Sequence, residues 1–247
     1  MKKVALFFTF LLLGTSGVFA QSNKYDLNGD GDVNITDVIE LVNYILGKDN
    51  GSGSGSNSPA EAIDLGLPSG TKWASCNVGA TKPEEYGGYY AWGEVEEKEV
   101  YNENSYKYYQ NGDYPNGKYV SIGSDISGTQ YDVAHVKWGG NWVMPTLDNI
   151  KELLDNCTDE WTTLNGVNGR KFTSKINGKS IFLPAAGSRW GGDLVFAGKY
   201  GFFCSSTQYP DPDYSDSAYG LRFYSSGAFW YSEFRAGGNS VRPVIRK

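Results

Sequence analysis

The chain has 247 residues, with 22 basic and 28 acidic side chains and a formal net charge of −6. An acidic protein repels nucleic-acid backbones and anionic membrane surfaces, so neither is expected as a partner. The 18 Tyr, 12 Phe and 7 Trp residues, combined with 32 Gly and only 20% charged residues, indicate a β-rich, loop-rich domain with an aromatic surface.

Residues 1–20 have the layout of a secretory signal peptide. Lys2 and Lys3 precede an apolar run over residues 4–13, and small and polar residues lead to a cleavage site after Ala20. The alternative is a membrane anchor, but about ten apolar residues are too few to cross a bilayer as a helix. Removing this segment takes away two basic residues and no acidic ones, which changes the net charge from −6 to −8. We expect an exported protein that is periplasmic, on the cell surface or extracellular.

The segment that follows has the spacing of a calcium-binding loop. Between Asp26 and Asp37, side chains that carry oxygen stand at loop positions one, three, five, nine and twelve. Gly31 stands at position six, where the loop turns sharply. The alternative is an acidic turn that binds no metal, but a hard cation prefers several oxygen ligands, and this spacing brings them together.

Asp37 stands where an EF-hand loop has Glu, and the pattern resembles the dockerin type I repeat, whose loop ends in Asp. The resemblance implies a Ca²⁺ site in which Asp32 contributes its backbone carbonyl and the other ligands contribute side chains. The implied metal ligands are Asp26, Asn28, Asp30, Asp32, Asn34 and Asp37.

The loop continues into a helix predicted over residues 35–46 and ended by Gly47. A helix of this length is not stable alone in water, so its apolar stripe must be covered. Dockerins have two repeats packed on each other, whereas this chain has one. The stripe is therefore expected to pack on the larger domain, on a second copy, or on a cohesin-like partner. Its residues are Ile35, Val38, Ile39, Val42, Ile45 and Leu46.

Residues 49–59 form a Gly/Ser-rich linker that behaves as flexible coil. We therefore predict a signal peptide over residues 1–20, a single dockerin-like repeat over 21–48, the linker, and one domain over 60–247. In that domain we expect a helix over residues 147–156 that begins after Thr146, with Ile150, Leu153 and Leu154 facing inward.

Two stretches in the second half of the large domain predict strands. A hairpin is expected over residues 171–183, with alternation through Ile176 and a two-residue turn at Asn177-Gly178. Residues 201–245 predict short aromatic strands separated by Gly, Ser, Asp and Pro.

Five sequence runs resemble the Fibrobacter major paralogous (FISUMP) domain. The resemblance covers nearly all of residues 60–247 and implies an α+β fold: a C-type-lectin-like domain rich in short β-strands and loops. It implies no established active site. The runs are LGLPSGTKWASCNVGA from Leu65, YYAWGE from Tyr89, WGGNWVMPT from Trp138, IFLPAAG from Ile181 and SVRPV from Ser240.

The chain has three cysteines, Cys76, Cys157 and Cys204. An odd number in an exported protein leaves at least one thiol unpaired or paired with another chain, and the spacing leaves the pairing open. Because Cys76 and Cys157 lie in segments that look like the family's framework, the resemblance implies a disulfide between them. Cys204 lies in a strand-like apolar run and is expected to be a buried free thiol.

The search for catalytic residues finds no motif. His135 is the one histidine and is expected to be structural, and the acidic run from Glu94 to Glu99 is expected to be a solvated loop. The short motifs by which C-type lectins bind sugar through calcium do not occur. We predict that the protein is not an enzyme. A cysteine-dependent enzyme of the formylglycine-generating type, which has a related fold, is the least favoured alternative.

Eleven aromatic residues lie between Phe202 and Phe234, interleaved with Ser, Asp and Gly. This composition is typical of a binding surface, because Tyr and Trp give large rigid contacts and small polar residues adapt. The alternative is framework, since alternation sends about half of each strand inward. The residues expected to contact a ligand form two candidate loops: Tyr209, Asp211, Asp213, Tyr214 and Asp216, then Phe229, Trp230, Tyr231, Glu233, Phe234 and Arg235.

The sequence thus predicts an exported, lectin-like binding protein for an unknown glycan or protein ligand, attached through a dockerin-like element. The second reading is an accessory component of a polysaccharide-degrading assembly, tethered by the same element.

Overall fold

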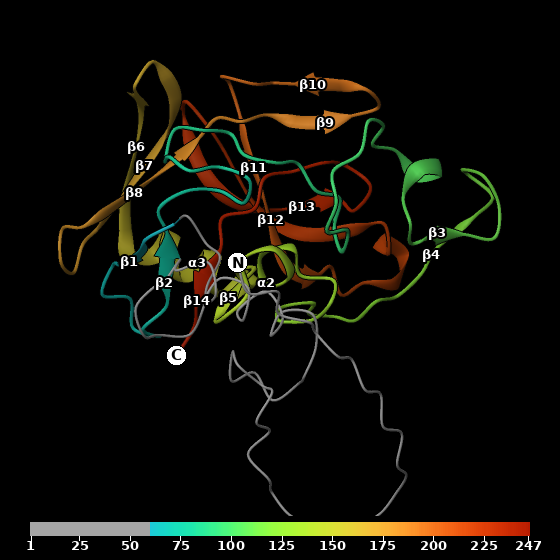
Figure 1. The fold of residues 1–247 in the computed structure, drawn as a ribbon, viewed down its shortest axis with the longest axis horizontal. Coiled ribbons are helices and arrows are strands. Elements are labelled where there is room, and N and C mark those ends of the chain that lie inside the picture. The colour runs from blue at the N-terminus through green and yellow to red at the C-terminus, as the bar shows by residue number, and fades with distance from the viewer. Residues whose placement is uncertain (1–59) are drawn as a thin grey trace, which may run out of the picture. The chain divides into compact units, whose positions relative to one another are not determined.

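The computed structural model describes residues 60–247. The predicted signal peptide, dockerin-like repeat and linker lie outside these residues. The described domain consists mostly of short β-strands in small sheets, with two α-helices (Figure 1). None of the helices described has the length and apolar character that crossing a bilayer requires. The coarse expectation of a β-rich domain is confirmed.

The first and last strands of the domain lie in one sheet. Its order is β1–β2–β14–β5, and all neighbours are antiparallel. Val244 of β14 pairs with Trp73 on one side and Val143 on the other, so the C-terminal strand lies between β2 and β5. The strands are β1 (Ala62–Asp64), β2 (Lys72–Ala74), β5 (Trp142–Val143) and β14 (Val244–Ile245).

Helix α3 spans Leu147–Asn156, as the sequence predicts. The side chain of Thr146 accepts a hydrogen bond from the backbone N–H of Asn149, and the side chain of Asn149 accepts one from the backbone N–H of Thr146. This reciprocal cap satisfies two donors that a helix start leaves free. Ile150 and Leu153 are buried, which confirms the inward face.

A three-stranded sheet follows α3. β6 (Cys157–Leu164), β7 (Val167–Ser174) and β8 (Ser180–Pro184) pair antiparallel in that order. The predicted β7–β8 hairpin is present, but β7 ends at Ser174 and Ile176 lies exposed in the turn. The reason is local: the Ser174 hydroxyl accepts hydrogen bonds from the N–H groups of Ile176 and Asn177, which turns the chain early.

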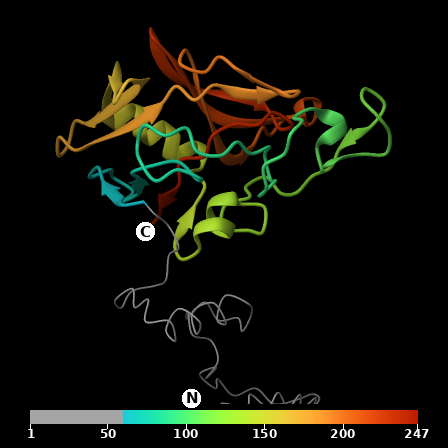
Figure 2. The same cartoon turned by 45° about the horizontal axis from the view of Figure 1, so that its top comes forward.

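The aromatic C-terminal region forms an antiparallel meander of three eight-residue strands, β11 (Gly201–Gln208), β12 (Ser217–Tyr224) and β13 (Gly227–Phe234). Helix α3 packs against all three strands (Figure 2). The 3₁₀ helix η2 (Pro212–Tyr214) lies between β11 and β12. The predicted strands therefore exist, but each is longer than expected.

Two small hairpins, one further helix and a second 3₁₀ turn complete the domain. β3–β4 lies at one end and the β6–β8 sheet at the other, in both views (Figures 1 and 2). The elements are η1 (Glu103–Ser105), β3 (Tyr109–Gln110), β4 (Lys118–Tyr119), α2 (Val133–Trp138), β9 (Ser188–Trp190) and β10 (Asp193–Val195).

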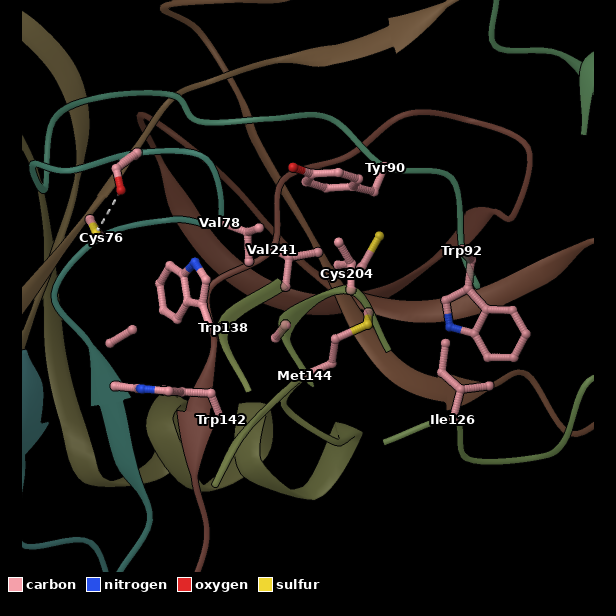
Figure 3. Packing of buried hydrophobic residues seen from close by; sticks show 14 of the residues in the cluster. Cys76, Val78, Tyr90, Trp92, Ile126, Trp138, Trp142, Met144, Cys204 and Val241 are labelled. Carbon is pink, nitrogen blue, oxygen red and sulfur yellow. Dashed lines mark hydrogen bonds between the residues drawn. The ribbon is translucent and has the colours of Figure 1, made fainter. Parts of the chain in front are cut away.

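The buried core is rich in aromatic rings and contains arginine. Trp138 and Trp142 meet edge-on, with ring centroids 5.3 Å apart (Figure 3). Arg242 is fully buried and donates hydrogen bonds to Asn77 Oδ1 and to the carbonyls of Ala74, Ser75 and Phe182. This guanidinium ties the C-terminal segment to β2 and β8.

All three cysteines are free and buried, so the disulfide implied between Cys76 and Cys157 is not formed. The two residues belong to different hydrophobic clusters. The Cys76 thiol instead donates to the carbonyl of Ala80 over 3.2 Å, the dashed line in Figure 3. Cys204 is a buried free thiol, as expected.

Candidate ligand-binding surface

The residues of the second candidate loop before Arg235 lie in strand β13, so they cannot all face the same side of the sheet. Consecutive side chains of a strand point to opposite faces. Trp230 contacts Tyr219, whereas Tyr231 contacts Phe229 and Arg222. The residues proposed as one surface therefore divide between the two faces of the β11–β13 sheet.

Arg235 is not a surface residue, so its predicted role in ligand contact is wrong. Only 1% of it is exposed. It donates to the Tyr106 hydroxyl and to the carbonyls of Ser215 and Val120, and its guanidinium carbon lies 4.7 Å from the centre of the Trp92 ring. The physical reason is that β13 ends at Phe234, after which the chain enters the core. Neutral acceptors and aromatic faces then stabilise the buried cation.

The first candidate loop surrounds η2. The carboxylate of Asp211 accepts the N–H of Asp213 over 3.0 Å and so caps the 3₁₀ turn. Asp216 is half-buried and accepts the Ser217 hydroxyl over 2.8 Å. Asp213 and Tyr214 are exposed, and Tyr214 is the exposed ring of this loop. Two of its three aspartates therefore have structural partners.

Three rings of the two candidate loops and the ring of Tyr219 form one continuous row, which we call the aromatic row: Tyr214, Tyr209, Tyr219 and Trp230. Successive ring centroids lie 5.6, 5.0 and 5.8 Å apart. The Nζ of Lys151, on α3, lies 5.5 Å from the centre of the Trp230 ring. Tyr219 links the two segments, and the sequence did not single it out.

A cleft of about 530 Å³ lies beside this row. It is bounded by residues 121–125, by the start of α3 and by the end of β11. Its walls are held by one backbone bond and one side-chain bond, because Gln208 N–H donates to Ser124 O over 2.8 Å and Leu147 N–H donates to Thr207 Oγ1 over 3.0 Å. The side chains that give it its chemistry are Asp125, Asp148, Thr207, Gln208, Tyr209 and Tyr219.

The opposite face of the sheet centres on Arg222. Its guanidinium carbon lies 4.1 Å from the Tyr231 ring centre and 4.9 Å from that of Phe202. Arg222 also forms an ion pair with Glu233 at 2.8 Å. Burial raises the pKa of Glu233 to about 7, and Arg222 opposes this shift. The predicted residues Phe229, Tyr231 and Glu233 therefore belong to an arginine-centred face, separate from the aromatic row.

The cysteine thiols lack the properties of nucleophiles. Burial raises the pKa of Cys157 to about 11 and that of Cys204 to about 12, and it raises the pKa of Cys76 as well. A nucleophilic cysteine needs thiolate character near neutral pH, which these environments disfavour.

Within residues 60–247, no group of three or more His, Cys, Asp or Glu side chains is placed to hold a metal ion. One prediction about a charged residue differs from the structure. Glu94 is not solvated as expected: its side chain is 10% exposed, and it pairs with Lys98 at 2.8 Å and accepts the Lys107 N–H.

Comparison with known proteins bears on the N-terminal segment. Residues 24–66 match the family model of the dockerin type I domain. All six implied metal ligands fall within the match, although they lie outside the described residues. The end of the match reaches β1, which pairs with β2 in the β-rich domain. No curated protein and no solved structure matches the chain significantly.

Proposed function

We propose that this protein is an exported, non-enzymatic binding protein. Its FISUMP-like, C-type-lectin-like domain presents the aromatic row to a glycan or protein ligand, and its N-terminal repeat serves as the attachment element. The observation that carries the proposal is the row itself: Trp230 is 48% and Tyr214 55% exposed, yet both rings are held by contacts with other rings. Exposed aromatic groups of this kind are typical of recognition surfaces.

The row suits binding because it is pre-organised. Tyr219 is held between Tyr209 and Trp230, so ordering these side chains on ligand binding loses little conformational freedom. The backbone beneath them is the regular β11–β12–β13 ladder. Affinity therefore depends on contacts to rigid rings more than on folding of a loop around the ligand.

The dockerin type I match supports the attachment role. Dockerins of this type bind calcium and pair with cohesins, and the loop from Asp26 to Asp37 has the oxygen ligands that Ca²⁺ prefers. We propose that calcium orders this segment and that the apolar stripe of residues 35–46 contacts a cohesin-like partner. The match also favours a second function, as an accessory component of a polysaccharide-degrading assembly outside the cytoplasm.

An array experiment tests ligand binding. Labelled mature chain, residues 21–247, is applied to immobilised glycans and proteins, together with its Trp230→Ala and Tyr231→Ala variants. We expect the wild type to bind and Trp230→Ala to lose binding. Trp190→Ala is the matched control, since Trp190 is 41% exposed but its ring contacts Phe234, which is not part of the row. Absence of any bound ligand, or binding that survives Trp230→Ala, would overturn the proposal. Tyr231→Ala, on the opposite face of the sheet, should bind as the wild type does.

Attachment is tested separately by capture of the mature chain on an immobilised cohesin. Capture that requires calcium and is lost in Asp30→Ala supports the dockerin role. Capture that is equal with calcium and with a chelator contradicts it.

A further inference from the structure

We infer that the cleft beside the aromatic row binds a neutral pyranose of a glycan chain, with the sugar ring packed against Tyr209 and Tyr219. The inference rests on the proposed binding function and names the site and the ligand class. It is carried by the shape, the rings and the charges of the cleft walls.

The two tyrosines form an apolar corner of the cleft. Their ring centroids are 5.0 Å apart and their planes are tilted by 46°, so the rings meet at an angle and do not stack. Trp230 supports Tyr219 from the side at 5.8 Å and 76°. A pyranose has an apolar face of C–H groups, which packs on an aromatic ring in the way other apolar groups do. The cleft volume of about 530 Å³ lies within the range of small-ligand sites.

The remaining walls offer partners for hydroxyl groups. Asp125 and Asp148 contribute carboxylates, which accept hydrogen bonds, and Gln208 contributes an amide that both donates and accepts. Asp125 is fixed in place because its Oδ1 accepts the Ser127 N–H over 3.0 Å. The Asp148 side chain is 92% exposed at the start of α3 and is therefore available to a ligand. Neighbouring hydroxyls of a sugar match such a combination of acceptors and an amide.

The charge of the cleft selects a neutral ligand. Its lining includes the two carboxylates and no lysine or arginine. The nearest cation to Asp148 is Lys151 at 4.0 Å, which lies over Trp230 outside the lining. Uronic acids and other anionic sugars would face repulsion from Asp125, and from Asp148 to the extent that the long, exposed ion pair with Lys151 does not offset it.

The backbone around the cleft favours a glycan over an extended peptide. Peptides that bind along a strand need unpaired N–H and C=O groups at a sheet edge. Here the end of β11 is already paired: Ser206 N–H donates to Pro145 O, Gln208 N–H donates to Ser124 O, and Thr207 bridges Asp125. What the cleft presents to a ligand is therefore mainly side chains.

Calorimetric titration of the mature chain tests this assignment. The probes are neutral hexasaccharides of glucose, mannose, xylose and galactose, oligogalacturonate of the same length, and a lysine-rich peptide. We expect at least one neutral oligosaccharide to bind and oligogalacturonate not to bind. Tyr209→Ala and Tyr219→Ala should each weaken binding about tenfold, because each removes an aromatic contact. Asp148→Asn should weaken it about threefold through loss of a charged acceptor.

Two variants serve as matched controls. Tyr219→Phe keeps the ring and should bind nearly as the wild type does. Tyr231→Ala removes a ring from the opposite face of the sheet and should leave the affinity unchanged. Circular dichroism would reveal whether Tyr219→Ala impairs folding. In that case Asp148→Asn and Gln208→Ala, which alter only the rim of the cleft, still test whether the cleft binds the sugar.

The outcomes separate the two proposals. Binding of a neutral oligosaccharide that is unaffected by Tyr209→Ala, Tyr219→Ala, Asp148→Asn and Gln208→Ala would overturn the cleft and leave the binding function standing. Binding of oligogalacturonate or the peptide alone would overturn the ligand class. Failure to bind any glycan or protein, in titration and on the array, would overturn the binding function and the cleft with it.

Discussion

Arg222 donates a hydrogen bond from Nε to one carboxylate oxygen of Glu233 over 2.9 Å, and its Nη2 forms an ion pair with the same oxygen at 2.8 Å. The pair lies on the arginine-centred face, where the guanidinium also contacts the rings of Tyr231 and Phe202. Burial of Glu233 outweighs the attraction of Arg222, so the pKa of this carboxyl is raised from its ordinary 4.5 to about 7. Near neutral pH the ion pair is therefore only partly formed.

The pH dependence of stability follows from this pair. Below pH 4.5 Glu233 is protonated in both the folded and unfolded states. Between pH 4.5 and 7 the folded state keeps its proton while the unfolded state loses it, so the free energy of unfolding falls as pH rises, by up to about 1.4 kcal/mol per pH unit. Urea unfolding from pH 4 to 8 measures this slope. Glu233→Gln should flatten it, whereas Glu160→Gln, at an exposed ion pair, should not. Equal slopes in the two variants would show that Glu233 does not titrate as described.

Replacement of Arg242 by Met should destabilise the domain strongly. The change removes the donor from four acceptors, Asn77 Oδ1 and three carbonyls, and each buried acceptor left without a partner costs about 1–3 kcal/mol. We expect a loss of at least about 3 kcal/mol in the free energy of unfolding, measured by urea titration. Arg246→Met is the matched control, because Arg246 is exposed and bonds to Ser127. Similar losses in both variants would contradict the role assigned to Arg242.

At the β6–β7 turn we predict a smaller loss of stability, caused by backbone conformation alone. Gly166 has φ +83°, and a Cβ placed there would meet no atom within 4 Å. Gly166→Ala should therefore cost about 1–2 kcal/mol of stability through the disfavoured backbone conformation alone. Gly192→Ala is the comparison, since Gly192 is equally open and does not have this positive φ. A loss in Gly192→Ala as large as that in Gly166→Ala would mean that backbone conformation is not the cause.

Elements with local signals could be predicted from the sequence. Helix α3 begins at a capping residue and shows an inward apolar face, and the β7–β8 turn has an Asn-Gly pair. The β6–β7 hairpin has the same signal at Asn165-Gly166. The sequence does not predict this hairpin, because β6 is mostly polar and lacks the apolar alternation of a half-buried strand. Its exposure explains this, because four of the eight residues of β6 are exposed and only Cys157 is buried.

Which aromatic rings meet on the candidate surface depends on how strands distant in the chain pair, and the sequence pattern does not predict that pairing. Tyr209 and Tyr214 are near in the chain, but Tyr219 meets Trp230 only because β12 and β13 pair in one particular register. The same register places Tyr231 on the other face. Arg235 follows Phe234 directly, and nothing in its neighbours indicated that the strand ends there.

Calcium should order the N-terminal segment of the mature chain. Because a metal that binds only the folded form stabilises it, calcium should increase helicity by circular dichroism, if necessary with a cohesin partner present. Asp30→Ala should abolish the response. Asp155→Ala, at an exposed position on α3, should preserve it. No calcium response in the mature wild type would remove the assignment of Asp26, Asn28, Asp30, Asp32, Asn34 and Asp37 as ligands.

Equilibrium binding to the glycan and protein array, recorded once with calcium and once with a chelator, tests most directly whether the aromatic row binds ligand independently of the attachment segment. We expect the mature wild type to bind the same ligand with equal affinity in both conditions, and Trp230→Ala to lose that binding in both. Binding that disappears with the chelator, or that Trp230→Ala retains, would contradict a ligand surface built on the row.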